Sequence, residues 1–292
     1  MKRAVGLCVA IAAVCFLVPM LGPSVGSASP ILVGRVHATY QPNDGKIFIL
    51  VIGNDARSGN PDAARADALH IVGINTHTMR GGILNFPRDS WINIPGHGSG
   101  KINETLQDGG PEFVATTLEQ LTGIHIDYWV MTGFQGFVGL LKRVGGIPVH
   151  VPIDLNDPSG SGAKMSAGYH KLYGLAALSF VRDRHDFPQG DLDRTTNQAS
   201  FLVGMLKKLR SQVSKNPAEV FKWIAAGREY TRFDLPAEEM FRLGILATQL
   251  KPRRMGIVTV PATTGSVGAE SVVYISSSAN AIYARFRKNG SL

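Results

Sequence analysis

Short apolar runs and amphipathic stretches alternate along most of the chain, and this pattern predicts strands alternating with helices. The first three runs are rich in β-branched residues, which is typical of strands buried on both faces of a sheet. They span residues 47–52, 69–74 and 83–86. Later runs predict further strands at 128–131, 148–151, 255–260 and 272–275.

Helices are predicted between these strands, where apolar residues recur every three to four positions. The clearest is 195–211, in which apolar residues share one face and the lysines lie off it. Thr132 and Gln135 resemble a capping box that opens the next helix, whereas 155–168 is expected to be a Gly/Ser/Pro loop. Further helices are predicted at 111–121, 132–144, 218–227, 237–249 and 279–288. The alternation predicts one α/β domain over residues 46–288.

The amino-terminal end is the most apolar part of the chain. Lys2 and Arg3 precede an almost wholly apolar stretch at 4–22. As a helix this stretch would span about 28 Å, close to the thickness of the bilayer hydrocarbon. We expect 1–22 to be a membrane anchor with its amino end in the cytoplasm, and a cleaved signal peptide is the alternative. Residues 23–45 are rich in Pro, Gly and Ser and predict an extracytoplasmic linker.

The charge of the chain points to an anionic partner. Of 292 residues, 30 are Lys or Arg and 22 are Asp or Glu, so the formal net charge is 30 − 22 = +8. Nucleic acid, phospholipid and phosphorylated glycan all fit this charge. Export disfavours nucleic acid, and no zinc-finger or RNP motif supports it. The only cysteines, Cys8 and Cys15, lie in the apolar leader, which leaves the exported part without a thiol for catalysis.

Two aspartates lie beside predicted strands. Asp55 belongs to GNDAR at 53–57, directly after the first strand, and Asp67 shortly precedes the second. Polar residues at strand ends commonly face the ligand crevice of an α/β sheet. Two carboxylates there fit a hard divalent cation that also binds substrate phosphates. The alternative is that both residues cap turns or form ion pairs with nearby arginines.

The segment FPRDSW at 86–91 follows the third predicted strand. Arg88 suits a bidentate contact to a phosphate, and Asp89 suits the acceptance of a proton. A surface turn that carries a salt bridge is the alternative for this pair.

Arginines cluster again at 179–198. If the start of this segment is extended, Arg182 and Arg184 project from the same face. Arg194 and Gln198 are four residues apart and would share a helical face. Several arginines, paired carboxylates and few nucleophiles are typical of pyrophosphate chemistry, which depends on positioning and charge neutralisation. A solvated polar loop is the alternative, and the apolar residues just before the arginines argue against it.

Taken together, these segments resemble the LytR-CpsA-Psr family, ligases that attach glycopolymers to bacterial peptidoglycan. The resemblance covers residues 46–213 and thins beyond them. It rests on motifs that occur in this order: ILVIGNDAR, RADA, GILNFPRDSWINIPG, KINET, GGPEFVATTLEQLTGIHIDYWV, FQGFVGLLKRVGGIPVHVP, LYGLAALSFVRDRH and DLDRTTNQ. The family's layout is also a short cytoplasmic end, one membrane span and an exported catalytic domain.

The resemblance implies a three-layer α/β/α sandwich around a mixed central sheet, with a polyprenyl tail held in an apolar tunnel. It also implies transfer of a glycan from polyprenyl pyrophosphate to the six-hydroxyl of peptidoglycan N-acetylmuramic acid, with polyprenyl phosphate released. Asp55 and Asp67 match the family's Mg²⁺-linked aspartates, with Mn²⁺ as the alternative metal. The expected catalytic residues are Arg88, Arg184 and Asp89. Asp89 is the candidate base, with a water or the cation itself as the alternative. The expected substrate-binding residues are Arg57, Arg65, Arg88, Lys101, Asn103, Arg182, Arg184, Arg194 and Gln198.

Three positions depart from the family pattern. Ala66 and Ala68 stand where a serine and a threonine usually flank the aspartate, and Asn197 stands where an arginine is frequent. Two hydroxyls near the metal are therefore missing, and a non-catalytic binding module and a pyrophosphohydrolase are kept as alternatives. Candidate residues to line the tail tunnel are Leu118, Leu121, Trp129, Phe134, Phe137, Leu141, Phe201 and Met205, and for each of them a place in the ordinary apolar core is the alternative.

Overall fold

The computed structural model describes residues 31–36, 45–56, 64–233 and 237–292 of the chain. The predicted anchor at 1–22, most of the predicted linker and Arg57 lie outside the described residues. Within the described residues, no helix combines the length and the apolar character that a bilayer crossing needs.

A seven-stranded sheet forms the centre of the described fold, with the strand order β12-β1-β7-β2-β3-β4-β13. It is mixed: β2 pairs antiparallel with β3 and parallel with β7, and β4 pairs parallel with β13. Its strands are β1 Ile31–Arg35, β2 Lys46–Asn54, β3 Ala66–Asn75, β4 Arg80–Phe86, β7 Tyr128–Thr132, β12 Thr231–Phe233 and β13 Met255–Thr259. The apolar runs that predicted central strands therefore form this sheet, except 148–151 and 272–275, which lie in separate two-stranded sheets.

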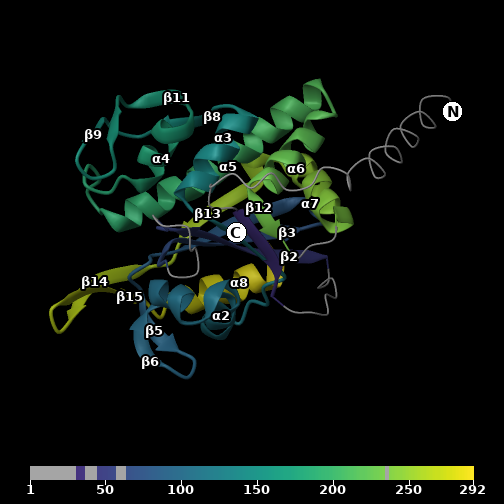
Figure 1. Ribbon diagram of the computed structural model, residues 1–292. Helices are drawn as coiled ribbons and strands as arrows, with labels where there is room; N and C mark the ends of the chain where they lie inside the picture. The colour runs from purple at the N-terminus through teal and green to yellow at the C-terminus, as the bar shows by residue number, and fades with distance from the viewer. Residues whose placement is uncertain (1–30, 37–44, 57–63, 234–236) are drawn as a thin grey trace.

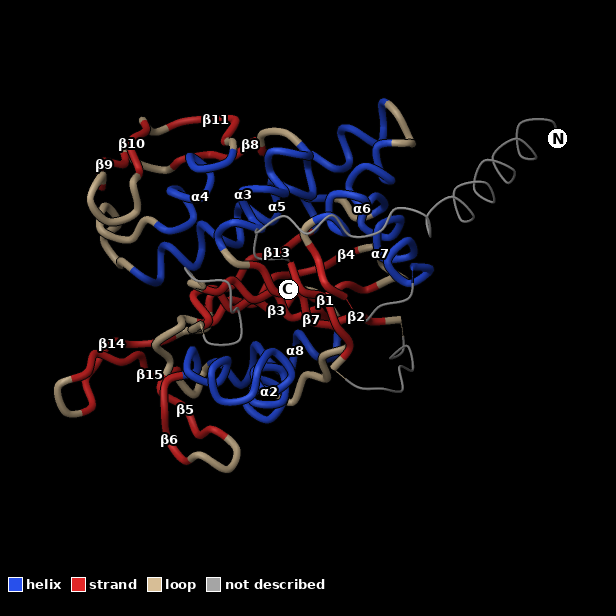
Figure 2. Tube along the Cα trace, in the orientation of Figure 1, coloured by secondary structure: helices blue, strands red, loops and turns tan. Residues whose placement is uncertain are grey.

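Helices cover both faces of the sheet, so the predicted three-layer sandwich is confirmed (Figure 1). Two helices lie on one face, α2 Thr105–Thr122 and α8 Ala279–Asn289. The other layer contains α3 Phe134–Val144, α4 Gly174–Arg182, α5 Asp191–Lys215, α6 Glu219–Glu229 and α7 Ala237–Gln249. Figure 2 shows the strands as a red layer between two groups of blue helices.

The face beneath α2 and α8 is packed closely. Leu50 and Ile52 of β2 contribute to one apolar cluster with Leu118 of α2 and Phe286 of α8, and all four are fully buried. Gly73 in β3 allows this approach, because a Cβ there would lie 2.5 Å from the ring of Phe286. This face is therefore a sealed core.

The opposite face is less completely filled. A second cluster, which includes Leu141, Phe180 and Phe201, holds α3, α4 and α5 together around the two-stranded sheet of β8 and β11. Val51, next to fully buried Leu50 in β2, is only half-buried on this side. Close packing is interrupted here, which leaves a space between the sheet and the helices.

Four two-stranded antiparallel sheets accompany the central sheet in the described residues, and three of them are hairpins of consecutive strands. They are β5 Trp91–Ile94 with β6 Gly98–Lys101, β8 Ile147–Val151 with β11 Gly168–Leu172, β9 Leu155–Asp157 with β10 Ala163–Met165, and β14 Ala262–Val267 with β15 Glu270–Ile275. Two 3₁₀ turns complete the described elements, Ile102–Glu104 and Pro252–Arg254.

Three local predictions were wrong. The expected loop at 155–168 contains the β9–β10 hairpin, whose strands are only three residues long and whose pattern is too short to recognise. Gly133, not Thr132, is the N-cap of α3, and the Thr132 hydroxyl donates instead to the carbonyl of Gly133. Arg182 is the last residue of α4, so Arg182 and Arg184 do not lie on an extended strand.

Candidate functional site: a cavity with an arginine-rich end and an apolar end

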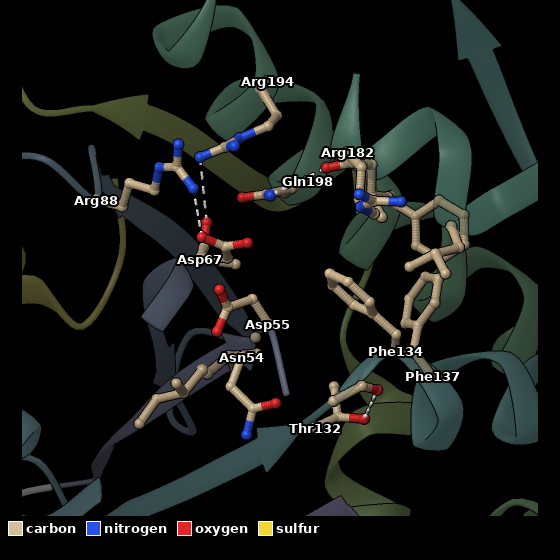
Figure 3. A pocket seen from close by; sticks show the side chains of 18 of the residues that line it. Asn54, Asp55, Asp67, Arg88, Thr132, Phe134, Phe137, Arg182, Arg194 and Gln198 are labelled. Atoms are coloured by element: carbon tan, nitrogen blue, oxygen red, sulfur yellow. Dashed lines mark hydrogen bonds and ion pairs between the residues drawn. The ribbon is translucent and has the colours of Figure 1, made fainter. Parts of the chain in front are cut away.

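A cavity of about 400 Å³ lies between the half-buried face of the sheet and helices α3, α4 and α5. One end is polar and is formed by the end of β2, the start of β3 and the start of α5. The other end is apolar and lies between the helices. Seven of the predicted site residues line the cavity: Asp55, Asp67, Arg88, Arg182, Arg184, Arg194 and Gln198. Figure 3 shows six of these pointing toward a common space.

The two predicted metal aspartates come from neighbouring antiparallel strands. The register of β2 and β3 shifts at Gly53 and Asn54, where β2 ends. Just beyond this irregularity the Asp55 amide donates to the carbonyl of Arg65 at 3.3 Å, and Oδ1 of Asp55 accepts the Arg65 amide at 2.9 Å. Asp55 and Asp67 are thereby presented on the same side of the sheet, as Figure 3 shows.

Buried Arg194 and half-buried Arg88 are linked through Asp67 and Asp191 at this end. Nη1 of Arg88 lies 2.5 Å from Oδ1 of Asp67, and Nη2 of Arg194 lies 2.6 Å from Oδ1 of Asp191. Cross-links complete the group: Nε of Arg88 lies 3.6 Å from Oδ1 of Asp191, and Arg194 donates to the carbonyl of Asp67 at 3.4 Å. The four side chains form one network that fixes both guanidiniums.

Burial perturbs this network. Burial lowers the pKa of Arg194 and raises the pKa of Asp191, because both charged forms lose hydration. For Arg88, burial alone acts downward, but Asp67, Asp191 and Asp89 together raise its pKa. Nε of Arg88 and Nε of Arg194 are buried and have no hydrogen-bond acceptor among the described residues. Unsatisfied buried donors are costly, so an anion with several acceptor oxygens fits this end of the cavity.

The remaining polar residues lie along the α4 and α5 side. The guanidinium of Arg182 stacks over the ring of Phe134, 4.7 Å from its centroid. Gln198 donates through Nε2 to the carbonyl of Val181 at 3.0 Å, which ties α5 to α4. Arg184 is exposed at the rim. The predicted pairing of Arg194 and Gln198 on one face of a helix is confirmed.

Four predicted residues are not among the described residues that line the cavity: Arg65, Asp89, Lys101 and Asn103. The carboxylate of Asp89 accepts a hydrogen bond from Asn103 at 3.4 Å. It also lies 3.6 Å from Nε of Arg88, so it forms an ion pair with Arg88 without lining the cavity itself. Lys101 forms an ion pair of 2.9 Å with Glu270 of β15. The sequence motifs are local, and they do not show that Lys101, at the end of β6, is directed toward β15 and not toward the cavity.

Four ionisable residues at or beside the cavity were not predicted from the sequence. Asp191 is not among the lining residues but pairs with Arg194, three residues later at the start of α5, and this spacing was the available signal. His70 is buried in β3, with Nδ1 2.8 Å from Oδ1 of Asn85, and burial lowers its pKa to about 4. Asp157 and His185 lie at the rim, from the segment expected to be a loop and from the end of VRDRH.

The apolar end matches half of the expected tail contacts. Phe134, Phe137, Phe201 and Met205 line the cavity, together with Leu140, Leu178, Val181 and Leu202. The other four expected contacts were wrong: Leu118, Leu121 and Trp129 pack in the sealed core, and Leu141 is fully buried in the second cluster. An amphipathic pattern shows that a helix has a buried face, but not which face of the sheet it packs on.

The carboxylates provide a partial metal site. Asp55 and Asp67 are the nearby hard oxygen donors, and one oxygen of Asp67 is engaged by Arg88. Among the described residues, no group of three or more His, Cys, Asp or Glu is arranged to hold a metal. Mg²⁺ commonly binds one or two carboxylates and completes its shell with water and substrate phosphates. The donor set therefore fits Mg²⁺ that is bound together with a phosphorylated substrate.

The chain matches the model of the LytR_cpsA_psr family over residues 29–288. Cell wall biosynthesis protein LcpA of Corynebacterium glutamicum is 31% identical over 296 residues, covering 84% of this chain and 56% of LcpA. Regulatory protein MsrR of Staphylococcus aureus is 30% identical over 215 residues, covering 72% of this chain and 64% of MsrR. The chain thus spans less than two thirds of the length of these relatives.

Solved structures share the fold. TagV of B. subtilis superimposes with a TM-score of 0.73 at 22% identity, covering 85% of this chain and 98% of TagV. The LytR-CPS2A-psr family protein YwtF (TagT), solved with bound octaprenyl pyrophosphate lipid, gives a TM-score of 0.67 at 21% identity, covering 92% of this chain and 98% of TagT. With the family match spanning most of the sequence, the chain belongs to the LytR-CpsA-Psr family.

Proposed function

We propose that this protein transfers a glycopolymer from a polyprenyl-pyrophosphate carrier to the six-hydroxyl of peptidoglycan N-acetylmuramic acid and releases polyprenyl phosphate. The observation that carries the proposal is the single cavity that joins an arginine-rich end to an apolar end. A lipid pyrophosphate has the same two parts. The names of similar proteins support it: LcpA is a cell wall biosynthesis protein, and TagT has been solved with octaprenyl pyrophosphate lipid and with LI-WTA.

The residues of the polar end would bind and polarise the pyrophosphate. Arg88 and Arg194 are held by carboxylates yet keep unsatisfied Nε donors, so they are preorganised for phosphate oxygens. Arg182 and Arg184 extend the positive charge to the rim, where the glycan would emerge. Charge that develops on the leaving phosphate would be stabilised without rearrangement of the arginines.

The apolar end would bind the isoprenoid tail. Phe134, Phe137 and Met205 are half-buried along its wall, so apolar surface is available there. Burial of apolar surface contributes about 25 cal/mol per Å², so a tail enclosed on several sides gains more than one lying on an open groove. This contact would hold the carrier while the glycan is transferred.

Asp55 and Asp67 would hold Mg²⁺ when the substrate is present, and the metal would supply neutralisation of phosphate charge. The test is Asp55→Ala: we expect loss of turnover with the fold retained, measured by glycan transfer and by circular dichroism. Undiminished turnover, or full activity in excess EDTA, would contradict the metal assignment.

The proposal also places the domain outside the cytoplasm at the cell membrane, with the lipid-linked glycan and peptidoglycan as partners. It rests on the apolar leader at 1–22, the basic charge and the family's role in the cell wall. A fluorescent tag at the carboxyl end that reports only in the cytoplasm would give no signal, whereas a bright signal would contradict the location.

Two alternatives are separated by one experiment. The full chain is incubated with a lipid-pyrophosphate glycan, Mg²⁺ and peptidoglycan fragments. Transfer of the glycan to the fragments supports the proposal. Cleavage of the lipid without transfer would identify a pyrophosphohydrolase, and tight binding without turnover would identify a binding module.

A further inference from the structure

A histidine and an aspartate form a pair at the rim of the cavity. Nδ1 of His185 lies 3.0 Å from Oδ2 of Asp157, and both residues line the cavity beside Arg182 and Arg184. Asp157 ends β9, and His185 lies in the segment between α4 and α5. The side chain of Asp157 is 8% exposed, whereas that of His185 is 56% exposed. The pair therefore has an enclosed carboxylate and an accessible ring.

The carboxylate of Asp157 is fixed by the backbone of the tight turn after β9. The Ser161 amide donates to Oδ2 at 2.7 Å, and the Gly160 amide donates to Oδ1 at 3.1 Å. The hydrogen bond from the Ser161 amide is the main reason that the pKa of Asp157 is lowered, with a further contribution from His185. Asp157 is consequently ionised and can only accept a hydrogen bond.

An ionised carboxylate determines the tautomer of the histidine beside it. Nδ1 of His185 must carry the proton that Asp157 accepts, so in the neutral ring Nε2 keeps a free lone pair. A base that is oriented by a fixed carboxylate is the arrangement that general-base catalysis uses.

Ser161 does not complete a catalytic triad. Its hydroxyl donates to the carbonyl of Asp157 at 3.4 Å and accepts the Ala163 amide at 3.0 Å, so it is engaged in the turn. The pair thus has a base and an orienting acid but takes its nucleophile from outside. An incoming hydroxyl group is the nucleophile that the proposed transfer requires.

We propose that His185, oriented by Asp157, accepts the proton of the acceptor hydroxyl, an inference that rests on the proposed function. The hydroxyl oxygen forms a bond to the phosphorus that carries the glycan, and its proton moves to Nε2 of His185. The bond from that phosphorus to the bridging oxygen breaks, and polyprenyl phosphate leaves with the electron pair. No oxidant or reductant is needed. Asp89, the candidate from sequence, is engaged by Asn103 and Arg88 behind the cavity.

Gly160 is a positioning residue for the pair. An added Cβ would lie 2.5 Å from Oδ2 of Asp157 and 2.7 Å from Nδ1 of His185, so only glycine permits this approach. Gly160→Ala therefore displaces the pair while leaving both ionisable groups present.

Charged residues near the His185 imidazole affect how kcat varies with pH. Besides Asp157, the charged residues that line the cavity with His185 from α4, the next segment and α5 are Arg182, Arg184 and Arg194, and Asp183, Asp186 and Asp191 lie in the same stretch of chain. Because a base that already holds a proton cannot accept another, kcat of the wild type should fall toward acidic pH, and kcat of His185→Gln should not.

The test is His185→Gln in the full chain, reconstituted in detergent with a synthetic polyprenyl-pyrophosphate disaccharide and a peptidoglycan oligomer. A general base contributes about 10²–10⁴-fold, so kcat should fall by that factor, KM for the lipid should change less than twofold, and the acidic limb of the pH profile should disappear. Asp157→Asn and Gly160→Ala should lower kcat by smaller factors, with KM for the lipid near the wild-type value. His150→Gln, an exposed histidine on β8, is the matched control and should leave kcat unchanged.

The outcomes are distinguishable. Transfer by His185→Gln at the wild-type rate, or a variant that raises KM with kcat intact, would overturn the base assignment alone. Absence of transfer by the wild type would overturn the proposed function and this inference with it.

Discussion

The two faces of the central sheet differ in how completely they are packed. Toward α2 and α8, Leu50 and Phe286 belong to a continuous apolar core and are fully buried. Toward α3, α4 and α5, Val51 and Phe137 remain half-buried around a cavity of about 400 Å³. Adjacent residues of one strand, Leu50 and Val51, therefore face a filled core on one side and a cavity on the other.

The difference also extends to charge. The cavity face contains buried Arg194 and His70, and burial shifts the pKa of each. Such groups cost folding free energy, because burial removes their hydration. The sealed face offsets this cost with apolar packing. We expect substitutions on the sealed face to change stability first and substitutions on the cavity face to change ligand binding or turnover first.

The largest effect is expected from Phe286→Ala on the sealed face. Removal of a fully buried aromatic side chain leaves a cavity and should lower the free energy of unfolding by about 3–5 kcal/mol, measured by urea denaturation. Affinity of the folded variant for lipid pyrophosphate should be unchanged. Tyr274→Ala, at an exposed tyrosine on β15, is the control and should cost much less. A large loss of affinity with little loss of stability would contradict the separation of the two faces.

A comparable effect on turnover is expected from Arg88→Ala on the cavity face. Loss of one preorganised donor should lower kcat by about 10²–10³-fold, or about 2.7–4 kcal/mol of transition-state stabilisation. Steady-state transfer assays check this, with Arg254→Ala as a control, since Arg254 is exposed and donates to the carbonyl of Thr78. Equal kcat values for the two variants would contradict a role for Arg88 in transition-state stabilisation.

Buried His70, on the cavity face, should make the free energy of unfolding of the protein depend on pH. The pKa of His70 is about 4 in the folded state and 6.5 when unfolded. Below pH 6.5 the unfolded chain takes up a proton that the folded chain refuses, so stability falls as the pH drops from 6.5 to 4. The loss is about 3 kcal/mol, at 1.36 kcal/mol per unit. Denaturation of wild type and His70→Gln across this range should show a flatter curve for the variant; parallel curves would contradict the assignment.

The smallest effect is expected from Phe137→Ala in the apolar wall. The ring is half-buried, so the stability loss should be small, while a bound tail would lose contact on one side. We expect the Kd for polyprenyl phosphate to rise about tenfold, or about 1.4 kcal/mol, by calorimetry. Phe221→Ala is matched, because Phe221 is half-buried on α6 and stacks on Phe241 outside the cavity. A similar rise in Kd for this control would show that the wall is not where the tail binds.

Much of the fold could be predicted from the sequence, because long apolar runs and amphipathic stretches record burial directly. Asp55, Asp67 and Arg88 were correctly placed at the polar end for the same reason, since each lies in or beside a central strand. Long-range packing could not be predicted. Because α2 packs on the sealed face, Leu118 does not reach the cavity. Lys101, at the end of the β5–β6 hairpin, pairs with Glu270 outside the cavity.

Asp157 and His185 show a second limit of local patterns. They are 28 residues apart, and their pairing depends on a hairpin with three-residue strands and on the close approach of Gly160. Neither feature has a periodic signal. Function-bearing contacts of this kind are visible only when the chain is folded.

We expect a polyprenyl pyrophosphate to occupy both ends of the cavity. A crystal structure of the protein with octaprenyl pyrophosphate would show where the lipid binds. Phosphate oxygens should lie against Nε of Arg88 and Nε of Arg194, and the tail should lie between Phe134, Phe137 and Met205. A lipid bound elsewhere, or a headgroup that leaves both arginines with only their carboxylate partners, would contradict this expectation.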